Sequence, residues 1–220
     1  MASAETFVSE LDAKNQDPKN TISVPRVVEN LSAGLAKEGF EVTDVLRLVI
    51  KTTIEAAEVA ALWVADCEDL EMKLSLAEQC GDGARQCREV AARLEALGQP
   101  PFDPRAGGYS KLFAFLRSLQ TPEERSAAGY VTGKALSMAR LGALAALCRE
   151  KGDGQTASLL ADTLLSQERR YYEEGKRLLT AVALNEESQA RGRRSAYRTL
   201  ELATEMVEPL QLRKLLPKKR

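Results

Sequence analysis

Hydrophobic residues recur at spacings of three and four along most of the chain, which is the period of an amphipathic α-helix. The first long repeat follows Thr43, a good N-cap residue, and should end between residues 66 and 69. A second repeat starts at Leu70 and stops at Gly98-Gln99-Pro100-Pro101, because a glycine followed by prolines ends a helix. The short gap between these repeats predicts an antiparallel helical hairpin.

A second hairpin is predicted after residue 121. Thr121-Pro122-Glu123-Glu124 combines a cap, a proline at the first helical position and two acids in the first turn, so a third helix should run from here to about Lys151. Gly152-Asp153-Gly154 ends that helix, and a fourth begins near Gln155. The apolar stripe of the fourth helix comprises Leu160, Leu164, Glu168, Tyr171, Gly175, Leu178, Leu179 and Val182.

No segment alternates strictly between apolar and polar residues, so the fold is expected to be all-α. Residues 41–185 would form an antiparallel four-helix bundle, with one long crossover that carries a short helix between its two hairpins. Residues 1–40 are interpreted as a polar leader with a short helix, partly disordered over residues 1–22. Residues 186–220 are interpreted as a charged helical C-terminal extension.

Composition narrows the chemistry that such a bundle could perform. The chain has 220 residues, with 31 Lys and Arg against 32 Asp and Glu, so its net charge of −1 indicates no nucleic-acid partner. It contains no histidine. Ser/His/Asp and Cys/His catalytic pairs, His-bound zinc and Glu-x-x-His di-iron ligand sets are therefore excluded, since each of them needs an imidazole.

The cellular setting is expected to be the cytoplasm. The N-terminus carries Glu5, Glu10 and Asp12. It lacks both the basic segment and the apolar segment of a secretory signal. Apolar stretches such as 56–65 are too short to span a bilayer, so no membrane association is predicted. The cysteines fall within helical patterns without a Cys-x-x-Cys pair, which favours small buried hydrophobes over a disulfide or a thiolate metal site: Cys67, Cys80, Cys87 and Cys148.

Two short segments carry a family resemblance. Residues 82–86 read Asp-Gly-Ala-Arg-Gln in the second helix, and residues 167–171 read Gln-Glu-Arg-Arg-Tyr in the fourth. Both are similar to the Asp-Glu-x-x-His motif that helices 2 and 4 present in di-iron proteins of the ferritin-like superfamily. Gly83 and Gln86 stand in the places of the glutamate and the histidine, whereas the fourth helix keeps Glu168 and has Tyr171 in the histidine place.

The resemblance also implies one glutamate from each of the other two helices. Glu55 lies in the apolar stripe of the first helix, and Lys134 is the best match in the third. Only two carboxylates survive from six ligand positions, so no metal, cofactor or catalytic residue is expected. Lys134 would occupy the former metal volume and pair with Glu168 and with Glu55, while Tyr171 donates a hydrogen bond; alternatively, both acids lie at helix edges.

Three functions remain open, and the sequence favours the first, which is non-enzymatic. It is a ferritin-like bundle that has lost its di-iron site and acts as a binding or scaffold subunit, with a protein partner or as a homodimer. The second is a metal-dependent oxygenase or oxidase with an unconventional all-carboxylate site drawn from Glu55, Glu58, Glu78, Asp82 and Glu168. The third is a bundle that binds a small ligand in the old cavity. The basic tail, 191–220, is interpreted as a solvated helix rather than a phosphate-binding surface.

Overall fold

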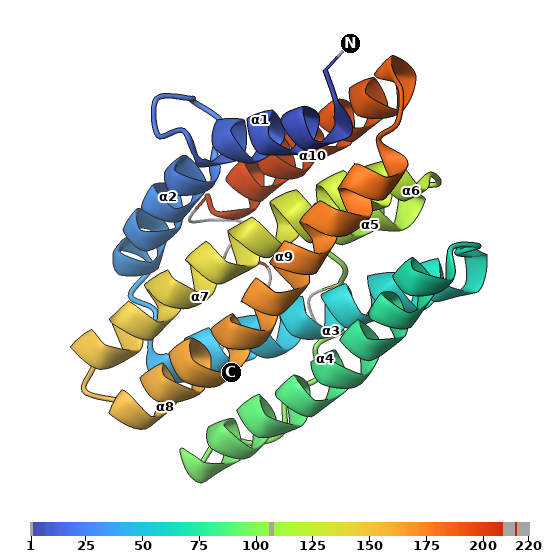
Figure 1. The fold of residues 1–220 in the computed structure, drawn as a ribbon. Helices are drawn as coiled ribbons and strands as arrows, with labels where there is room; N and C mark the ends of the chain where they lie inside the picture. The colour runs from blue at the N-terminus through green and yellow to red at the C-terminus, as the bar shows by residue number, and fades with distance from the viewer. Residues whose placement is uncertain (1, 106–107, 209–213, 215–220) are drawn as a thin grey trace.

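The computed structural model describes residues 2–105, 108–208 and 214, and this part of the chain is all-α, as predicted, with no strand in it. Figure 1 shows the order of the helices. Their bounds are α1 Ala4–Gln16, α2 Val24–Lys37, α3 Val42–Asp66, α4 Leu70–Ala96, α5 Lys111–Ser118, α6 Pro122–Arg125, η1 Ser126–Thr132, α7 Gly133–Glu150, α8 Gly154–Ser158, η2 Leu159–Leu164, α9 Leu165–Val182 and α10 Glu186–Met206, where η marks a π-helical segment.

The first predicted hairpin is present as α3 and α4. The start of α3 differs by two residues from the prediction: Glu41, not Thr43, is the N-cap, and its backbone N–H donates to the Asp44 carboxylate at 3.3 Å. Asp69 caps α4 by accepting from the Met72 N–H at 2.8 Å. Beyond α4, Gly98 adopts a φ of 74°, a left-handed conformation that favours glycine and ends the helix.

The second hairpin is built from α6, η1 and α7 on one side and α8, η2 and α9 on the other. Thr121 and Glu124 form the predicted N-terminal cap, since each side chain accepts from the backbone N–H of the other. Each half of the hairpin contains a π-helical segment, η1 just before Lys134 and η2 shortly before Glu168. A π-turn inserts one extra residue and rotates every later side chain about the helix axis, so these segments set which residues face inward.

The leader prediction for residues 1–22 is wrong. Most of this region is α1, which packs against α9 and α10 and buries Phe7, Val8 and Leu11. The Tyr172 hydroxyl donates to the Asp12 carboxylate and ties α1 to α9. A polar composition hid these contacts, because three buried apolar side chains are enough to anchor a short helix when a larger core supplies the partner surface.

The C-terminal extension is also packed more closely than expected. Along α10, Ala196, Thr199 and Leu200 are buried, and Arg191 forms an ion pair with Glu123 at 2.5 Å. This helix is therefore part of the core rather than a solvated extension. The last basic residues of the predicted tail lie outside the described residues, namely Arg213, Lys218, Lys219 and Arg220.

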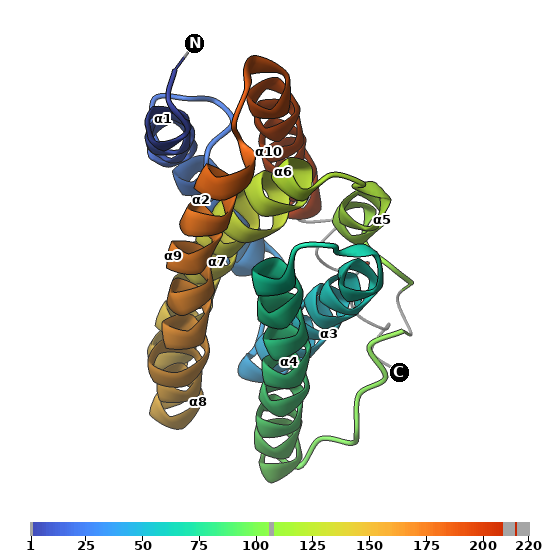
Figure 2. The same cartoon turned by 45° about the vertical axis from the view of Figure 1, so that its right-hand side comes forward.

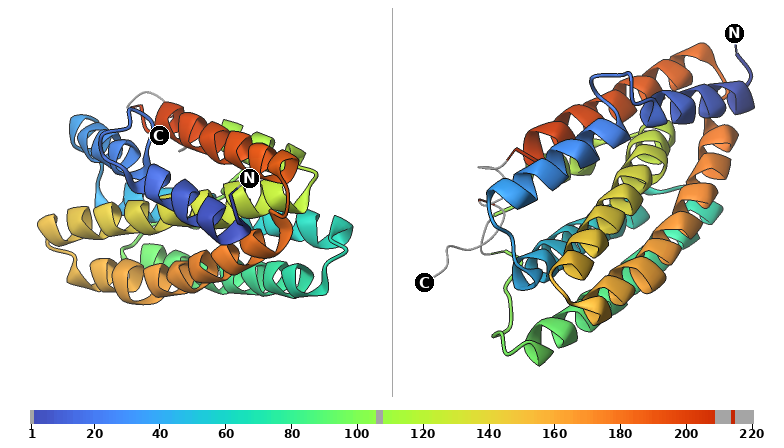
Figure 3. Two further views of the ribbon diagram at one scale, coloured as in Figure 1. Left: turned by 45° about the horizontal axis from the view of Figure 1, so that its top comes forward. Right: turned by 90° about the vertical axis from the view of Figure 1, so that its left-hand side faces the viewer.

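The helices form three layers. The α3–α4 hairpin lies on one side of the α7–α9 pair, and α1, α2 and α10 cover the other side (Figures 1 and 3). By length and composition alone, the continuous helix Pro122–Glu150 could cross a membrane, a criterion that the central helices of soluble proteins also meet. Here that helix is the middle of the three-layered core, in contact with α2, α3, α9 and α10.

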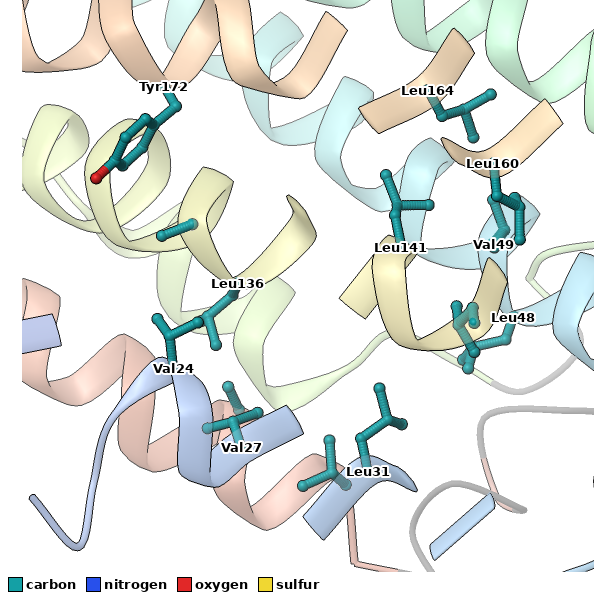
Figure 4. Packing of buried hydrophobic residues seen from close by; sticks show 14 of the residues in the cluster. Val24, Val27, Leu31, Leu48, Val49, Leu136, Leu141, Leu160, Leu164 and Tyr172 are labelled. Atoms are coloured by element: carbon teal, nitrogen blue, oxygen red, sulfur yellow. The ribbon is translucent and has the colours of Figure 1, made fainter. Parts of the chain in front are cut away.

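The largest apolar cluster joins the layers. Val24, Val27 and Leu31 of α2 lie against Leu136 and the neighbouring turns of α7 in Figure 4. Cys67 and Cys148 are buried, Cys80 and Cys87 are partly buried, and all four are free thiols.

The apolar stripe predicted for the second helix is wrong at its N-terminal end. Leu70 and Leu74 are exposed, whereas Met72 and Leu76, on the same turns of α4, are buried.

Candidate functional site

A single cavity of about 170 Å³ is lined by all six positions that the degenerate motif singles out. It lies where the two hairpins meet, and its wall is completed by side chains from α2, α5 and α10. Figure 2 looks along this junction, with α4 and α9 facing each other. The six positions are Glu55, Gly83, Gln86, Lys134, Glu168 and Tyr171.

Lys134 and Glu168 form the predicted ion pair. The Lys134 Nζ atom lies 3.3 Å from the Glu168 carboxylate, and the two side chains are only 11% and 12% exposed. The same ammonium lies 5.1 Å from the centroid of the Tyr171 ring, a cation–π distance. The alternative in which Glu168 lies at an exposed helix edge is therefore wrong.

Glu55 does not join that pair, contrary to the expectation. Its carboxylate lies 3.2 Å from the Lys51 Nζ atom, one helical turn earlier, and accepts from the Ser110 backbone N–H at 3.0 Å and hydroxyl at 2.6 Å. Lys51 also donates to the carbonyls of Pro104 and Gly108 at 3.0 and 2.5 Å. Glu55 is thus a buried, fully engaged carboxylate that holds the crossover connection against α3.

Sequence analysis missed Lys51 and Ser110 as partners of Glu55. The spacing of four between Lys51 and Glu55 is a signal for an ion pair along one helix face. Nothing in the sequence identifies Ser110, because it lies in the crossover, whose path is set by tertiary packing.

On α4, Gly83 and Gln86 have structural roles. A Cβ atom on Gly83 would lie 2.8 Å from the Ala57 Cβ atom, so the glycine allows close approach of α3 and α4. The Gln86 amide nitrogen donates to the Gln167 side-chain oxygen at 2.6 Å and links α4 to α9. Neither residue presents a metal ligand to the cavity in this arrangement.

Tyr171 donates a hydrogen bond, as expected, and its acceptor is a residue of α4. Its hydroxyl donates to the Asp82 carboxylate at 2.7 Å, and Arg170 reaches the same carboxylate at 2.9 Å. Burial raises the pKa of Tyr171 to about 12, so the phenol is neutral at physiological pH. Sequence analysis considered Asp82 only as a possible metal ligand, but the structure shows it accepting these hydrogen bonds between α4 and α9.

A di-iron centre does not fit this site. The chain has no imidazole, and each surviving carboxylate, Glu55 and Glu168, is already paired with a lysine ammonium. Among the residues that the structure describes, no three Cys, Asp or Glu side chains gather where they could hold a metal ion. Glu78, from the alternative all-carboxylate set, instead forms an exposed ion pair with Arg170.

Arg140 is the cavity residue that sequence analysis did not single out. It lies on α7 and lines the cavity with Ser137, and its Nε atom is fully buried without a hydrogen-bond partner among the described residues. Its closest polar contact is an Nη2 to Ser137 hydroxyl distance of 3.5 Å. The spacing of three from Lys134 to Ser137 to Arg140 was the available signal, because it places all three on one helix face.

The cavity wall is mainly apolar, and its charges are mostly neutralised in pairs. These pairs are Lys51–Glu55, Lys134–Glu168 and Arg170–Asp82. The carboxylate in each pair already contacts a cationic side chain. A concave, mainly apolar surface with a few fixed polar groups is the usual composition of a small-molecule site.

Comparison with known proteins assigns neither a family nor a function to the chain. No family model matches the chain, and no curated protein and no solved structure has a significant match to it.

Proposed function

We propose that this chain is a ferritin-like bundle that has lost its di-iron site and acts without catalysis, binding a small molecule in the cavity that remains. One observation carries the proposal: the six positions identified from the degenerate motif line the same cavity. They come from both hairpins and are spread over more than a hundred residues of sequence. A chance match of short motifs would not be expected to bring them together.

The arrangement of the chain supports the ferritin-like part of the proposal. Two helical hairpins are joined by a long connection, residues 97–121, which contains α5. This is the connectivity of a four-helix bundle with one crossover. Lys134 fits the role of a fixed cation where metal ions would otherwise balance the carboxylate charge, since it neutralises Glu168 in the cavity wall.

Binding is favoured over metal-dependent catalysis by the state of the carboxylates. Glu55 and Glu168 would each have to leave a buried ammonium before they could coordinate a cation. Breaking either ion pair leaves an uncompensated buried charge, which costs about 3–5 kcal/mol. A ligand that fills the apolar volume without coordinating through these carboxylates needs no such rearrangement.

A titration with benzene tests the proposed function. An apolar cavity of roughly 150 Å³ is large enough to hold benzene, so saturable binding in the millimolar range is expected here. Ser137→Leu would fill the cavity and should abolish binding, whereas Ser166→Leu, at an exposed position on α9, should not. Equal binding by both folded variants, or no saturable binding by the unmodified protein, would show that the cavity is not the site.

The proposed protein partner or homodimer remains a prediction, as do the cytoplasmic location and the absence of a nucleic-acid partner. Size-exclusion chromatography with light scattering would give the oligomeric state directly. A co-purification from the native host would identify a partner.

A further inference from the structure

One cationic side chain of the cavity, that of Arg140, has no ion-pair partner among the described residues. No carboxylate of the described residues lies within 4.0 Å of the Arg140 guanidinium, and its Nε–H, buried in the cavity wall, has no acceptor among them. Buried N–H groups in proteins nearly always have an acceptor. The Arg140 side chain lines the cavity, so an acceptor bound there would lie next to its guanidinium.

The charge balance of the cavity indicates the sign of that acceptor. The ion pairs of Glu55 with Lys51 and of Glu168 with Lys134 are each neutral. Asp82 is paired with Arg170 on the cavity side and also contacts Arg85, which is largely exposed to solvent. The uncompensated charge inside the cavity is therefore the positive charge of Arg140, and an anion would restore neutrality.

Arg140 keeps that charge despite its surroundings. Burial lowers the pKa of its guanidinium, while the negative charges of Glu168 and Glu55 raise it. An arginine starts from a pKa above 12, so it stays protonated at neutral pH. A planar guanidinium with free N–H groups pairs best with a carboxylate, which it can bind through two parallel hydrogen bonds.

We propose that the ligand of this cavity is a small monocarboxylic acid with a compact apolar body, bound as its anion with the carboxylate on Arg140. This inference rests on the proposed function, because it names the chemical class of the molecule that the cavity binds. The apolar body lies against leucines that line the cavity, among them Leu48, Leu141 and Leu164, which are labelled in Figure 4.

The cavity volume limits the size of the apolar body. At about 170 Å³ the cavity is close to the size that holds benzene. A benzoate-sized acid would fill it, whereas acetate would leave the leucine surface uncovered. The apolar and charged parts of the ligand should therefore both contribute to the affinity.

Calorimetric titration of the full chain with four probes tests the proposal. Benzoate carries both features, benzamide and benzene lack the charge, and acetate lacks the apolar body. Benzoate should bind more tightly than acetate, because acetate leaves the leucine surface uncovered. It should also bind at least about tenfold more tightly than benzamide, since a charge-assisted hydrogen bond is worth about that factor or more. Arg140→Met should remove this preference and leave benzamide binding within about twofold of its original value.

Two further variants test whether the effect of Arg140→Met is specific to this side chain. Arg149→Met, at an exposed position on the same helix, should leave all four affinities unchanged. Arg140→Lys should retain part of the preference for benzoate, because it keeps the charge and loses the bidentate geometry. Arg140→Met should also raise the melting temperature of the ligand-free protein, since it removes a buried N–H without a partner.

The probes separate the two levels of the proposal. Binding of benzene without any preference for benzoate would overturn the carboxylate inference and leave the proposed function standing. Equal affinity for acetate and benzoate would overturn the inference as well, because it would reduce Arg140 to a simple anion site. If no probe binds, the proposed function itself is wrong.

Discussion

The ion pair of Lys134 and Glu168 gives the sharpest test of how the cavity is stabilised. The two charged atoms lie 3.3 Å apart on side chains that are about nine-tenths buried. At this separation the attraction between unit charges is about 5 kcal/mol for an effective dielectric constant near 20. Removal of one partner from such a pair costs about 3–5 kcal/mol, because the other is left buried and uncompensated.

Lys134→Met and Glu168→Gln should lower the free energy of unfolding by different amounts. In Lys134→Met, the Glu168 carboxylate still feels the positive charge of Arg140, which offsets part of the loss. In Glu168→Gln, both Lys134 and Arg140 lose the negative charge that acts on them. Lys134→Met should therefore cost about 3 kcal/mol and Glu168→Gln somewhat more.

The double variant Lys134→Met/Glu168→Gln should recover much of the loss, since no buried charge is left unpaired. Urea unfolding followed by circular dichroism would give the coupling energy of the cycle, which should be at least about 2 kcal/mol. The exposed pair of Arg26 and Glu29 is the control, and its cycle should give at most about 1 kcal/mol. Equal coupling energies in the two cycles would show that the buried pair contributes no more than a surface contact.

Three further outcomes follow from the structure. Gly83→Ala should destabilise the fold by about 1–3 kcal/mol, because its Cβ atom would meet Ala57, whereas Gly81→Ala, two residues away and exposed, should stabilise α4 by about 0.5–1 kcal/mol in the same urea assay. The free energy of unfolding should fall between pH 10 and pH 12, because an unfolded tyrosine ionises there but Tyr171 stays protonated. Tyr171→Phe should weaken this pH dependence. If the variant loses stability with pH as steeply as the unmodified protein, burial does not raise the pKa of Tyr171. Elemental analysis of aerobically purified protein should find no stoichiometric iron or manganese, and two irons per chain would refute the loss of the di-iron site.

Much of the fold followed from periodicity. The long helices were predicted within a few residues of their observed ends, because repeats of three and four and strong terminators such as Gly98 act locally. The ion pair of Lys134 with Glu168 was also predicted, from the resemblance of both positions to ligand positions of the ferritin-like di-iron proteins. Periodicity did not locate η1 or η2, whose extra residues depend on tertiary packing.

The contacts that sequence analysis did not predict all depend on how distant segments pack together. Ser110 reaches Glu55 only because the crossover folds back over α3, and α1 is held only because α9 and α10 present an apolar surface. Such contacts are decided by long-range packing, which leaves little trace in local sequence. Arg140 was detectable by its spacing from Lys134, but its lack of an acceptor is a property of the folded cavity.

A methyl NMR titration with benzene tests the central claim most directly, because it locates the ligand as well as detecting it. The claim predicts saturable shifts at the methyl groups of cavity leucines, foremost Leu48, Leu141 and Leu164. Methyl groups of the exposed Leu70 and Leu74 should not move in the same titration. Shifts confined to the exposed leucines, or no saturation at any methyl group, would contradict the account.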